Sequence, residues 1–393
     1  MNNLQEYRRK LNSINKNYSD REVEQLRCEV LNNLKKSGFI ITDDGKLITP
    51  EDKNYIRDVH RNSVNYILEK NRSFILKRES IYLNKYIIDG KSLDVKNISP
   101  RLILVENKED SNIFRWIKMH WSIPISAGYG RRLRYIVQNE NDKSIMGIIG
   151  LDDPIYALKN RDNYIGWSTE QRKNRLKHVM DAFVLGAIPP YSIVLGGKLI
   201  ASLVTSPEIR HDFKHKYAGK QSRISGEIFN GKLAAVTTAS ALGKSSIYDR
   251  IKIPNGSEFL HTGWTKGSGE FQFATSIYDK LHDLASQSVK WTKNPLWGKG
   301  TRNRRVVIQQ ALRMLGLPPG FDYHNIKREL FLIPLGSKSI EYLNGRSKYI
   351  KYYHATQDEI SQYMLRRWMT PRSERRKEYL AFKADDYSLI GRL

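Results

Sequence analysis

The chain has 393 residues, which is enough for two or three domains with a sizeable buried core. Its 66 lysines and arginines outnumber its 41 acidic residues and give a formal net charge of +25. No stretch approaches the roughly 18 uninterrupted apolar residues of a membrane span, and a single cysteine excludes an internal disulfide and a multi-cysteine zinc site.

The excess positive charge is spread along the chain and indicates a nucleic-acid partner, DNA more than RNA. A dense line of phosphates gains affinity for such a surface by releasing its counterions. The alternative is that the abundance of lysine, asparagine and isoleucine reflects an AT-rich genome. The first ten residues lack the apolar run of a signal peptide, so we expect a cytoplasmic protein without a membrane partner.

Helical signals dominate residues 1–98, the first of three expected domains. Apolar residues at helical spacing predict a helix over residues 19–37, with Ser19 and Glu22 as a capping box and Gly38 just past its end. Cys28 is expected to be a small core residue of this helix. A second helix is predicted to open at residues 49–52 and a third to cover residues 73–88.

Residues 99–290 form the second expected domain, a mixed core. After a strand at 102–105 and a helix at 112–121, the runs 133–137 and 145–149 predict a β-hairpin, and residues 183–188 predict a further strand. A glycine turn then precedes a helix that begins at residue 199 and is interrupted near residue 207. Another strand at 233–236, a helix opening at 241–248 and a closing hairpin of 259–264 with 269–273 complete the expected order.

This order of elements resembles the outline of a GNAT-type acyltransferase core. The resemblance implies that Gly196, Gly197 and Lys198 hold a phosphate of an acyl-CoA or similar donor, at a helix N-terminus that favours anions. It also implies that Tyr248 is a general acid. The alternative for the glycine turn is a tight strand-to-helix connection that binds nothing. The expected fold is therefore α+β, a GNAT-like mixed sheet core with an N-terminal helical unit and a basic C-terminal α/β extension.

Residues 291–393 form the third expected domain, which is strongly basic. Cations alternate with aromatic residues and glycines over residues 291–305, a composition that suits a nucleic-acid groove. A further basic run surrounds Trp368, and an arginine pair precedes the first hairpin; for each of them the alternative is a solvated surface or edge. The candidate nucleic-acid-binding residues are Arg131, Arg132, Lys299, Arg302, Arg304, Arg305, Arg366, Arg367 and Arg372.

Several acidic residues near predicted turns could act as magnesium ligands in a metal-dependent nuclease. They are Asp152, Asp153, Asp162, Asp181 and Glu227. Aspartates beside turns more often cap helices or bond their own backbone. The chain has no His-Glu-x-x-His, Cys-x-x-Cys or full Walker A motif. The sequence therefore assigns no metal ligands, and the cofactor is unknown.

Several segments resemble the DruA family of Druantia anti-phage systems. The clearest is Arg-Asp-Asn-Tyr-Ile-Gly-Trp at residues 161–167, and others lie at residues 245–250, 323–329 and 367–372. The resemblance covers about residues 120–380. It implies anti-phage defence with other defence proteins as partners, or a mobile-element context with DNA processing, and it implies no particular reaction. Because Asp162 lies in the clearest segment, it joins Tyr248 and Glu227 as a candidate catalytic residue.

Overall fold

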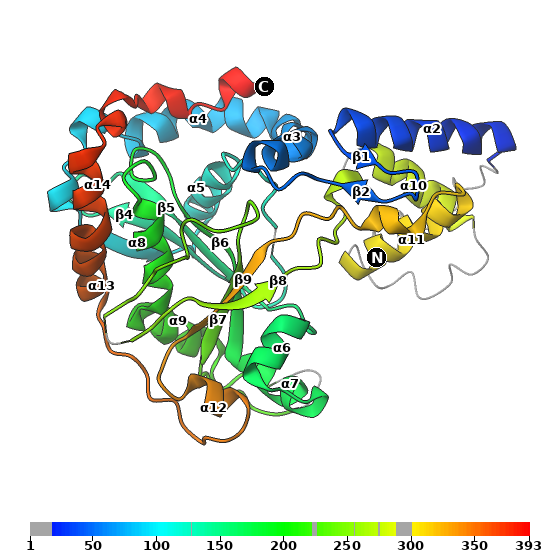
Figure 1. Ribbon diagram of the computed structural model, residues 1–393. Helices are drawn as coiled ribbons and strands as arrows, with labels where there is room; N and C mark the ends of the chain where they lie inside the picture. Colours follow the sequence, from blue (N-terminus) through cyan, green and yellow to red (C-terminus); the bar gives the residue numbers. More distant parts are fainter. Residues whose placement is uncertain (1–17, 127, 222–225, 255, 274–275, 288–300) are drawn as a thin grey trace. The chain divides into compact units, whose positions relative to one another are not determined.

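The computed structural model describes residues 18–393, apart from residues 127, 222–225, 255, 274–275 and 288–300 and the side chains of residues 276, 301–303 and 319. The chain divides into two compact units, whose elements are labelled in Figure 1. Unit 1 comprises residues 1–67, 122–124 and 265–327, and unit 2 comprises residues 68–121, 125–264 and 328–393. Each unit therefore combines distant parts of the chain, and the three-domain division stays a prediction.

Unit 2 is built on a seven-stranded sheet with the order β3-β4-β5-β6-β7-β9-β8. The strands are β3 (Pro100–Leu104), β4 (Leu133–Asn139), β5 (Ile145–Asp152), β6 (Val179–Ala187), β7 (Ala235–Ala239), β8 (Leu260–Trp264) and β9 (Glu329–Pro334). Neighbouring strands are antiparallel except β6 and β7, which run parallel. The expected α+β class is confirmed.

The centre of the sheet is covered on both faces, because every residue of β5 is buried. Apolar side chains of β4, β5 and β6 share one cluster with those of α8 (Gly196–Ser202) and α13 (Gln357–Met364). These two helices lie side by side in Figure 1. Each fully buried aliphatic side chain in such a cluster stabilises the fold by about 1.5–3 kcal/mol, so the sheet is a rigid base for the loops at its ends.

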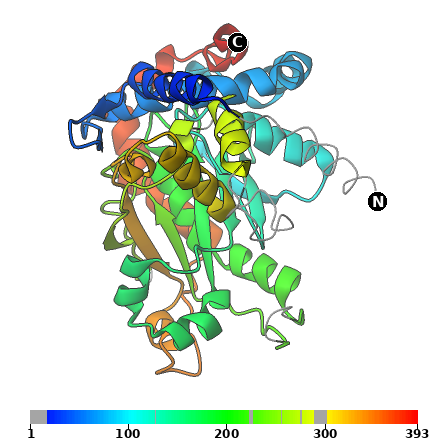
Figure 2. The same ribbon diagram turned by 90° about the vertical axis from the view of Figure 1, so that its right-hand side faces the viewer.

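The other helices of unit 2 surround the sheet. They are α4 (Arg72–Tyr86), α5 (Lys108–Lys118), α6 (Lys159–Ile165), α7 (Thr169–Arg175), α9 (Pro207–Tyr217), α12 (Ser339–Leu343) and α14 (Thr370–Arg375), with a π-helical stretch at Leu365–Met369 before α14. The chain runs from β5 through α6 and α7 into β6. Both views place α6 and α7 at the lower end of the sheet (Figure 1 and Figure 2).

Unit 1 contains α2 (Asp20–Lys36), the short strands β1 (Ile40–Ile41) and β2 (Leu47–Ile48), most of α3 (Lys53–Lys70), α10 (Ser276–Ser286) and α11 (Thr301–Met314). The capping box at Ser19 and Glu22 is confirmed. The second helix begins later than residues 49–52, because the Asp52 carboxylate accepts hydrogen bonds from the backbone N–H groups of Asn54 and Tyr55 and so caps α3. In the described chain no helix combines the length and apolar character of a membrane span.

The helix predicted to open at residues 241–248 does not form. The Ser245 hydroxyl accepts hydrogen bonds from the backbone N–H groups of Ile247 and Tyr248, which gives the chain an alternative to helical bonding. Gly243 and Arg250 also have positive φ angles of 69° and 66°, which a right-handed helix cannot include.

Two further predictions are wrong. The partner of β8 is β9, whereas Phe271–Phe273 forms a 3-10 turn in unit 1 and the backbone N–H of Gly269 bonds to the Asp322 carbonyl. Cys28 is exposed. The buried stripe of α2 consists of Leu26, Val30 and Leu34, and a helix turns about 100° per residue, so Cys28 lies on the opposite side from that stripe.

Candidate functional site

The segment Arg-Asp-Asn-Tyr-Ile-Gly-Trp forms a buried ion-pair network at the start of α6. Arg161, whose exposed fraction is 1%, donates to Asp162 Oδ1 from Nε at 2.9 Å and from Nη2 at 2.7 Å. Arg172 Nη1 donates to Asp162 Oδ2 at 3.1 Å. The Asp162 carboxylate is therefore shared by two guanidinium groups and is held by both.

The same network fixes the loop between β5 and α6. Arg161 Nη1 donates to the carbonyl oxygen of Ile155 at 2.8 Å, and Nη2 donates a second hydrogen bond to the carbonyl oxygen of Tyr156 at 3.1 Å. Asp162 accepts a further hydrogen bond from the backbone N–H of Leu158. The geometry thus gives Asp162 a positioning task. A catalytic role for it stays a prediction.

Two carboxylates outside this network lie beside each other on neighbouring central strands of the sheet. Asp152 at the end of β5 is the direct neighbour of Asp181 on β6. The Tyr129 N–H donates to Asp152 Oδ2 at 3.1 Å, and the Thr237 hydroxyl donates to Asp181 Oδ1 at 2.5 Å. This acid pair, Asp152 and Asp181, is brought together only by the pairing of β5 with β6.

Both members of the acid pair hold protons more strongly than ordinary aspartates. Burial, together with the negative charge of Asp181, raises the pKa of Asp152 to about 7. Burial also raises the pKa of Asp181 to about 6, against the opposing effects of the Thr237 hydrogen bond and the Arg161 charge. A carboxyl group that titrates near neutral pH can give or take a proton, which is the chemistry of a general acid or base.

The magnesium cluster considered from the sequence does not assemble. Among the residues that the structure describes, no group of three or more His, Cys, Asp or Glu side chains could hold a metal ion. Asp153 is paired with Arg131, Asp162 with two arginines, and Glu227 with Lys177 on the surface. The acidic residues are thus distributed among separate ion pairs and one acid pair.

The glycine turn opens α8, as predicted, but it is buried. All seven residues of α8 are buried, and a side chain on Gly197 would contact Ile247. The Lys198 ammonium donates to the carbonyl oxygens of Ile247 at 2.6 Å and Asp249 at 2.8 Å. Burial lowers the pKa of Lys198 to about 8. Residues 247–249 therefore cover this turn.

Tyr248 lies in that covering segment. Its ring stacks on Phe259 and meets Phe331 edge-on. Its hydroxyl forms a hydrogen bond with the Thr238 side chain, and burial raises its pKa to about 12. The environment of Tyr248 is that of a core tyrosine with a satisfied hydroxyl, and its general-acid role stays a prediction.

Three of the arginines predicted to contact nucleic acid, Arg131, Arg304 and Arg305, are engaged by acidic side chains of the protein. Arg304 forms an ion pair with Glu270 and Arg305 one with Asp322, each at 2.9 Å within unit 1. Arg131 is bound by Asp153 and by the carbonyl oxygens of Lys177 and Val179.

The remaining predicted cations differ from one another. Arg366 and Arg367 are exposed in the π-helical stretch, where Arg367 lies over the Trp368 ring, and Arg372 is half-buried. Lys299 and the side chain of Arg302 lie outside the described residues. Binding by any of these residues stays a prediction.

A different group of cations remains available, and we call it the basic cluster. It consists of Arg115 and Lys118 on α5, Arg132 and Arg134 at β4, and Lys216 and Lys220 at the end of α9. Burial lowers the pKa of Lys118, and the charges of Arg134, Arg115 and Arg132 lower it further. Burial likewise lowers the pKa of Lys216, with Arg134 and Lys220 adding to the effect and the charge of Glu106 opposing it. The six charges therefore lie close enough to repel one another.

Neutral groups hold five of the six cations of the basic cluster. Arg115 donates to the Asn71 side chain, Arg134 to the Ser111 hydroxyl and Arg132 to the Gly128 carbonyl oxygen. Lys118 and Lys216 donate to the carbonyl oxygens of Ser126 and Arg132. Within the described part of the chain, no ion pair joins any of the six to a carboxylate.

The spacing of these cations in the sequence indicates that the members of each pair lie on the same face of their element. Arg132 and Arg134 alternate along a strand, Arg115 and Lys118 are three residues apart on a helix, and Lys216 and Lys220 are four apart at a helix end. Their convergence could not have been read from the sequence, because it depends on how α5, β4 and α9 pack.

Comparisons with known proteins agree on the family. The family model described as Druantia protein DruA matches residues 50–345. The chain is also 36% identical over 379 residues to a curated protein of Escherichia coli (strain UMEA 4076-1) named Druantia protein DruA, covering 95% of this chain and 93% of that protein. The chain belongs to the Druantia protein DruA family. No solved structure matches it.

The DruA match includes both the acid pair and the basic cluster, as well as the network around Asp162. Arg366, Arg367 and Arg372 lie beyond the matched residues. The segment that begins at Arg161 lies close to the acid pair, because its loop follows the strand that carries Asp152.

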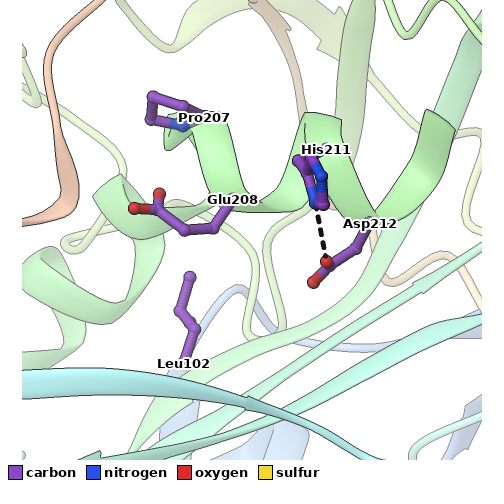
Figure 3. Close-up of a pocket in the computed structure, with 5 residues that line it drawn as sticks. All are labelled: Leu102, Pro207, Glu208, His211 and Asp212. Carbon is purple, nitrogen blue, oxygen red and sulfur yellow. Dashed lines mark hydrogen bonds and ion pairs between the residues drawn. The ribbon is translucent and has the colours of Figure 1, made fainter. Parts of the chain in front are cut away.

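A shallow hollow of about 360 Å³ lies beside the start of α9 (Figure 3). It is lined by Leu102, Pro207, Glu208, His211 and Asp212. The Asp212 carboxylate lies 3.5 Å from His211 Nδ1 and also accepts a hydrogen bond from the Tyr135 hydroxyl. Two carboxylates make this hollow unsuitable for a phosphate, so we place the candidate site at the basic cluster and the acid pair.

Proposed function

We propose that this DruA-family chain acts in anti-phage defence by binding nucleic acid through the basic cluster. The family resemblance supports the defence role, and the partner would be invading DNA in the cytoplasm. The observation that carries the binding proposal is that neighbouring cations repel one another while neutral acceptors, and not carboxylates, hold five of the six. Their charge is left to be neutralised by an external polyanion.

Physical chemistry favours phosphates as that polyanion. Placing like charges together costs free energy in the unbound protein, and a row of phosphates relieves this repulsion while releasing its own counterions. Arginine and lysine contacts of this kind recognise the backbone and not the base sequence. We therefore expect binding that varies little with sequence and weakens steeply with salt.

The test replaces three cations of the cluster by glutamine, which keeps a hydrogen-bonding side chain but removes the charge. The variant combines Lys118→Gln, Arg134→Gln and Lys216→Gln. For this variant we expect the slope of log affinity for a DNA duplex against log salt concentration to be smaller in magnitude by about 3, roughly one for each lost phosphate contact.

The matched control removes the same charge elsewhere on unit 2. Lys91, Lys96 and Lys348 are exposed, and their replacement by glutamine should leave the salt dependence close to that of the parent protein. Equal effects of the two triple variants would show that net charge alone drives binding, and an unchanged slope for the cluster variant would contradict the proposal.

We further propose that the sheet of unit 2 is GNAT-like. In support, the chain passes through a hairpin (β4 and β5), a strand (β6), the glycine turn with α8, and a strand (β7), before the antiparallel pair β8 and β9. The chain differs from the GNAT outline in two ways: it lacks the helix after β7, and residues 265–327 are inserted between β8 and β9. An acyltransferase role gains little support, because the glycine turn and Tyr248 are both buried.

A further inference from the structure

Large apolar side chains gather where β5 leads into α6, and we call them the aromatic platform. Ile155 and Tyr156 lie in the connecting loop, Tyr164 on α6, Tyr129 before β4 and Trp264 at the end of β8. Their exposed fractions lie between 41% and 59%. Apolar groups that stay in water side by side commonly mark a binding surface.

Backbone contacts bring the parts of this platform together. The backbone N–H of Asp153 donates to the Tyr129 carbonyl oxygen, so Tyr129 lies beside the loop. The end of β8 packs on α6, since a side chain on Gly263 would collide with Asn160. All five side chains belong to unit 2.

The buried network beneath the loop holds these exposed side chains in place. Arg161 binds the carbonyl oxygens of Ile155 and Tyr156, and its own charge is neutralised by Asp162. Arg172 bonds to the same carboxylate and lies 4.9 Å from the Tyr156 ring centre. Burying charged groups has a large desolvation cost. A simple connection needs no such anchor, whereas a binding surface gains from a fixed geometry.

Cations lie on the two helices that follow the platform loop, whereas Tyr129 lies near the carboxylates of Asp152 and Asp153. Lys159 on α6 and Lys173 on α7 are exposed, and Arg172 lies over one of the rings. Arg132 of the basic cluster donates to the Gly128 carbonyl oxygen, immediately before Tyr129. The platform and the basic cluster are therefore adjacent through residues 128–132.

We propose that the aromatic platform stacks the unpaired bases of a single-stranded nucleic acid whose phosphates contact the basic cluster. Aromatic rings beside cations are the usual means of binding single strands without sequence preference, because every base has a π-face. A duplex hides those faces between its own base pairs. This inference rests on the proposed function and adds to it the class of nucleic acid and the residues that contact its bases.

The test compares an intact single-stranded DNA of 20 nucleotides with an abasic strand of the same length, which has the phosphates but no bases. We expect the protein to bind the intact strand more tightly. In the variant Tyr156→Ala with Tyr164→Ala, affinity for the intact strand should fall by about ten- to a hundredfold, since two stacking contacts are lost. Affinity for the abasic strand should not change.

Matched variants separate stacking from folding. Tyr156→Phe with Tyr164→Phe keeps the rings and should bind the intact strand as the parent does. Leu76→Ala with Ile81→Ala removes two equally exposed apolar side chains from α4 and should have no effect. A single-stranded RNA and a DNA duplex, tested alongside, show whether the sugar matters and whether unpaired bases are required.

Other outcomes overturn the inference. Equal affinity of the parent protein for intact and abasic strands would show that the bases do not contact the platform. Unchanged binding by the double alanine variant would show the same, and the exposed rings would then be a surface for a protein partner. Loss of abasic binding in the alanine variant would do the same. Absence of binding to every nucleic acid tested would instead refute the proposed function itself, so the two failures are distinguishable.

Discussion

The ion-pair network around Asp162 and the basic cluster use the same residue types for opposite purposes. In the network, buried Arg161 and partly buried Arg172 share one carboxylate, so each of them has an ion-pair partner within the fold. In the cluster, Lys118 and Arg134 are held by a backbone carbonyl and a hydroxyl, so their charge remains. The partner of a cation, more than its exposure, thus separates positioning residues from residues able to bind an external anion.

The largest effect is expected from breaking the network. Asp162→Ala leaves two guanidinium groups without their carboxylate, and removing one partner of a buried ion pair costs about 3–5 kcal/mol. Urea unfolding should show this loss against the exposed control Glu374→Ala, which should change stability by less than about 0.5 kcal/mol. A stable Asp162→Ala protein that no longer protects cells against phage would instead identify Asp162 as a functional residue.

A second prediction concerns an arginine that the sequence assigned to nucleic acid. Arg305→Gln removes the charged partner of Asp322, whose side chain is almost fully buried and keeps a hydrogen bond from Gln309, and should destabilise unit 1 by about 1–3 kcal/mol. Its affinity for DNA should change far less than that of the cluster variant. DNA binding at several salt concentrations and the melting temperature check this prediction. If Arg305 contacts phosphates, DNA affinity should fall while the melting temperature stays nearly unchanged.

The acid pair provides a pH-dependent comparison. The folded pKa of Asp152 is about 7 against an ordinary value of 3.8, so the folded state binds the proton more tightly. The stability from this proton is fully present below about pH 4 and is lost as pH rises through 7.

Asp152→Asn should therefore stabilise the protein at pH 8, by about 1 kcal/mol or more, because each unit of pKa displacement corresponds to about 1.4 kcal/mol. The gain should shrink towards pH 5. Denaturant unfolding of both proteins across this range measures it, and a difference independent of pH would mean that Asp152 is not protonated in the folded state.

The smallest effect is expected at Glu227, whose ion pair with Lys177 lies at the surface. Exposed pairs contribute about 0–1 kcal/mol, so Glu227→Gln should leave the melting temperature nearly unchanged. Phage protection should also persist if Glu227 serves only this pair. A folded but unprotective Glu227→Gln variant would restore its predicted catalytic role.

The sequence by itself determined the elements whose signals are local. Helical periodicity and the cap at Ser19 predicted α2, and alternating apolar residues predicted the β4–β5 hairpin. These signals suffice because they depend on residues a few positions apart. The family resemblance was equally readable, since it requires only matching residues along the chain.

Tertiary structure decided which charges remain available. Arg131 and Arg132 are adjacent in sequence, yet Arg131 is bound by Asp153, whereas Arg132 bonds to a carbonyl oxygen and joins the basic cluster. Asp152 and Asp181 meet only because β5 pairs with β6. Such outcomes depend on partners that folding brings from distant positions, and a charge is neutralised only by a group within a few ångströms of it. Local sequence carries no record of that distance.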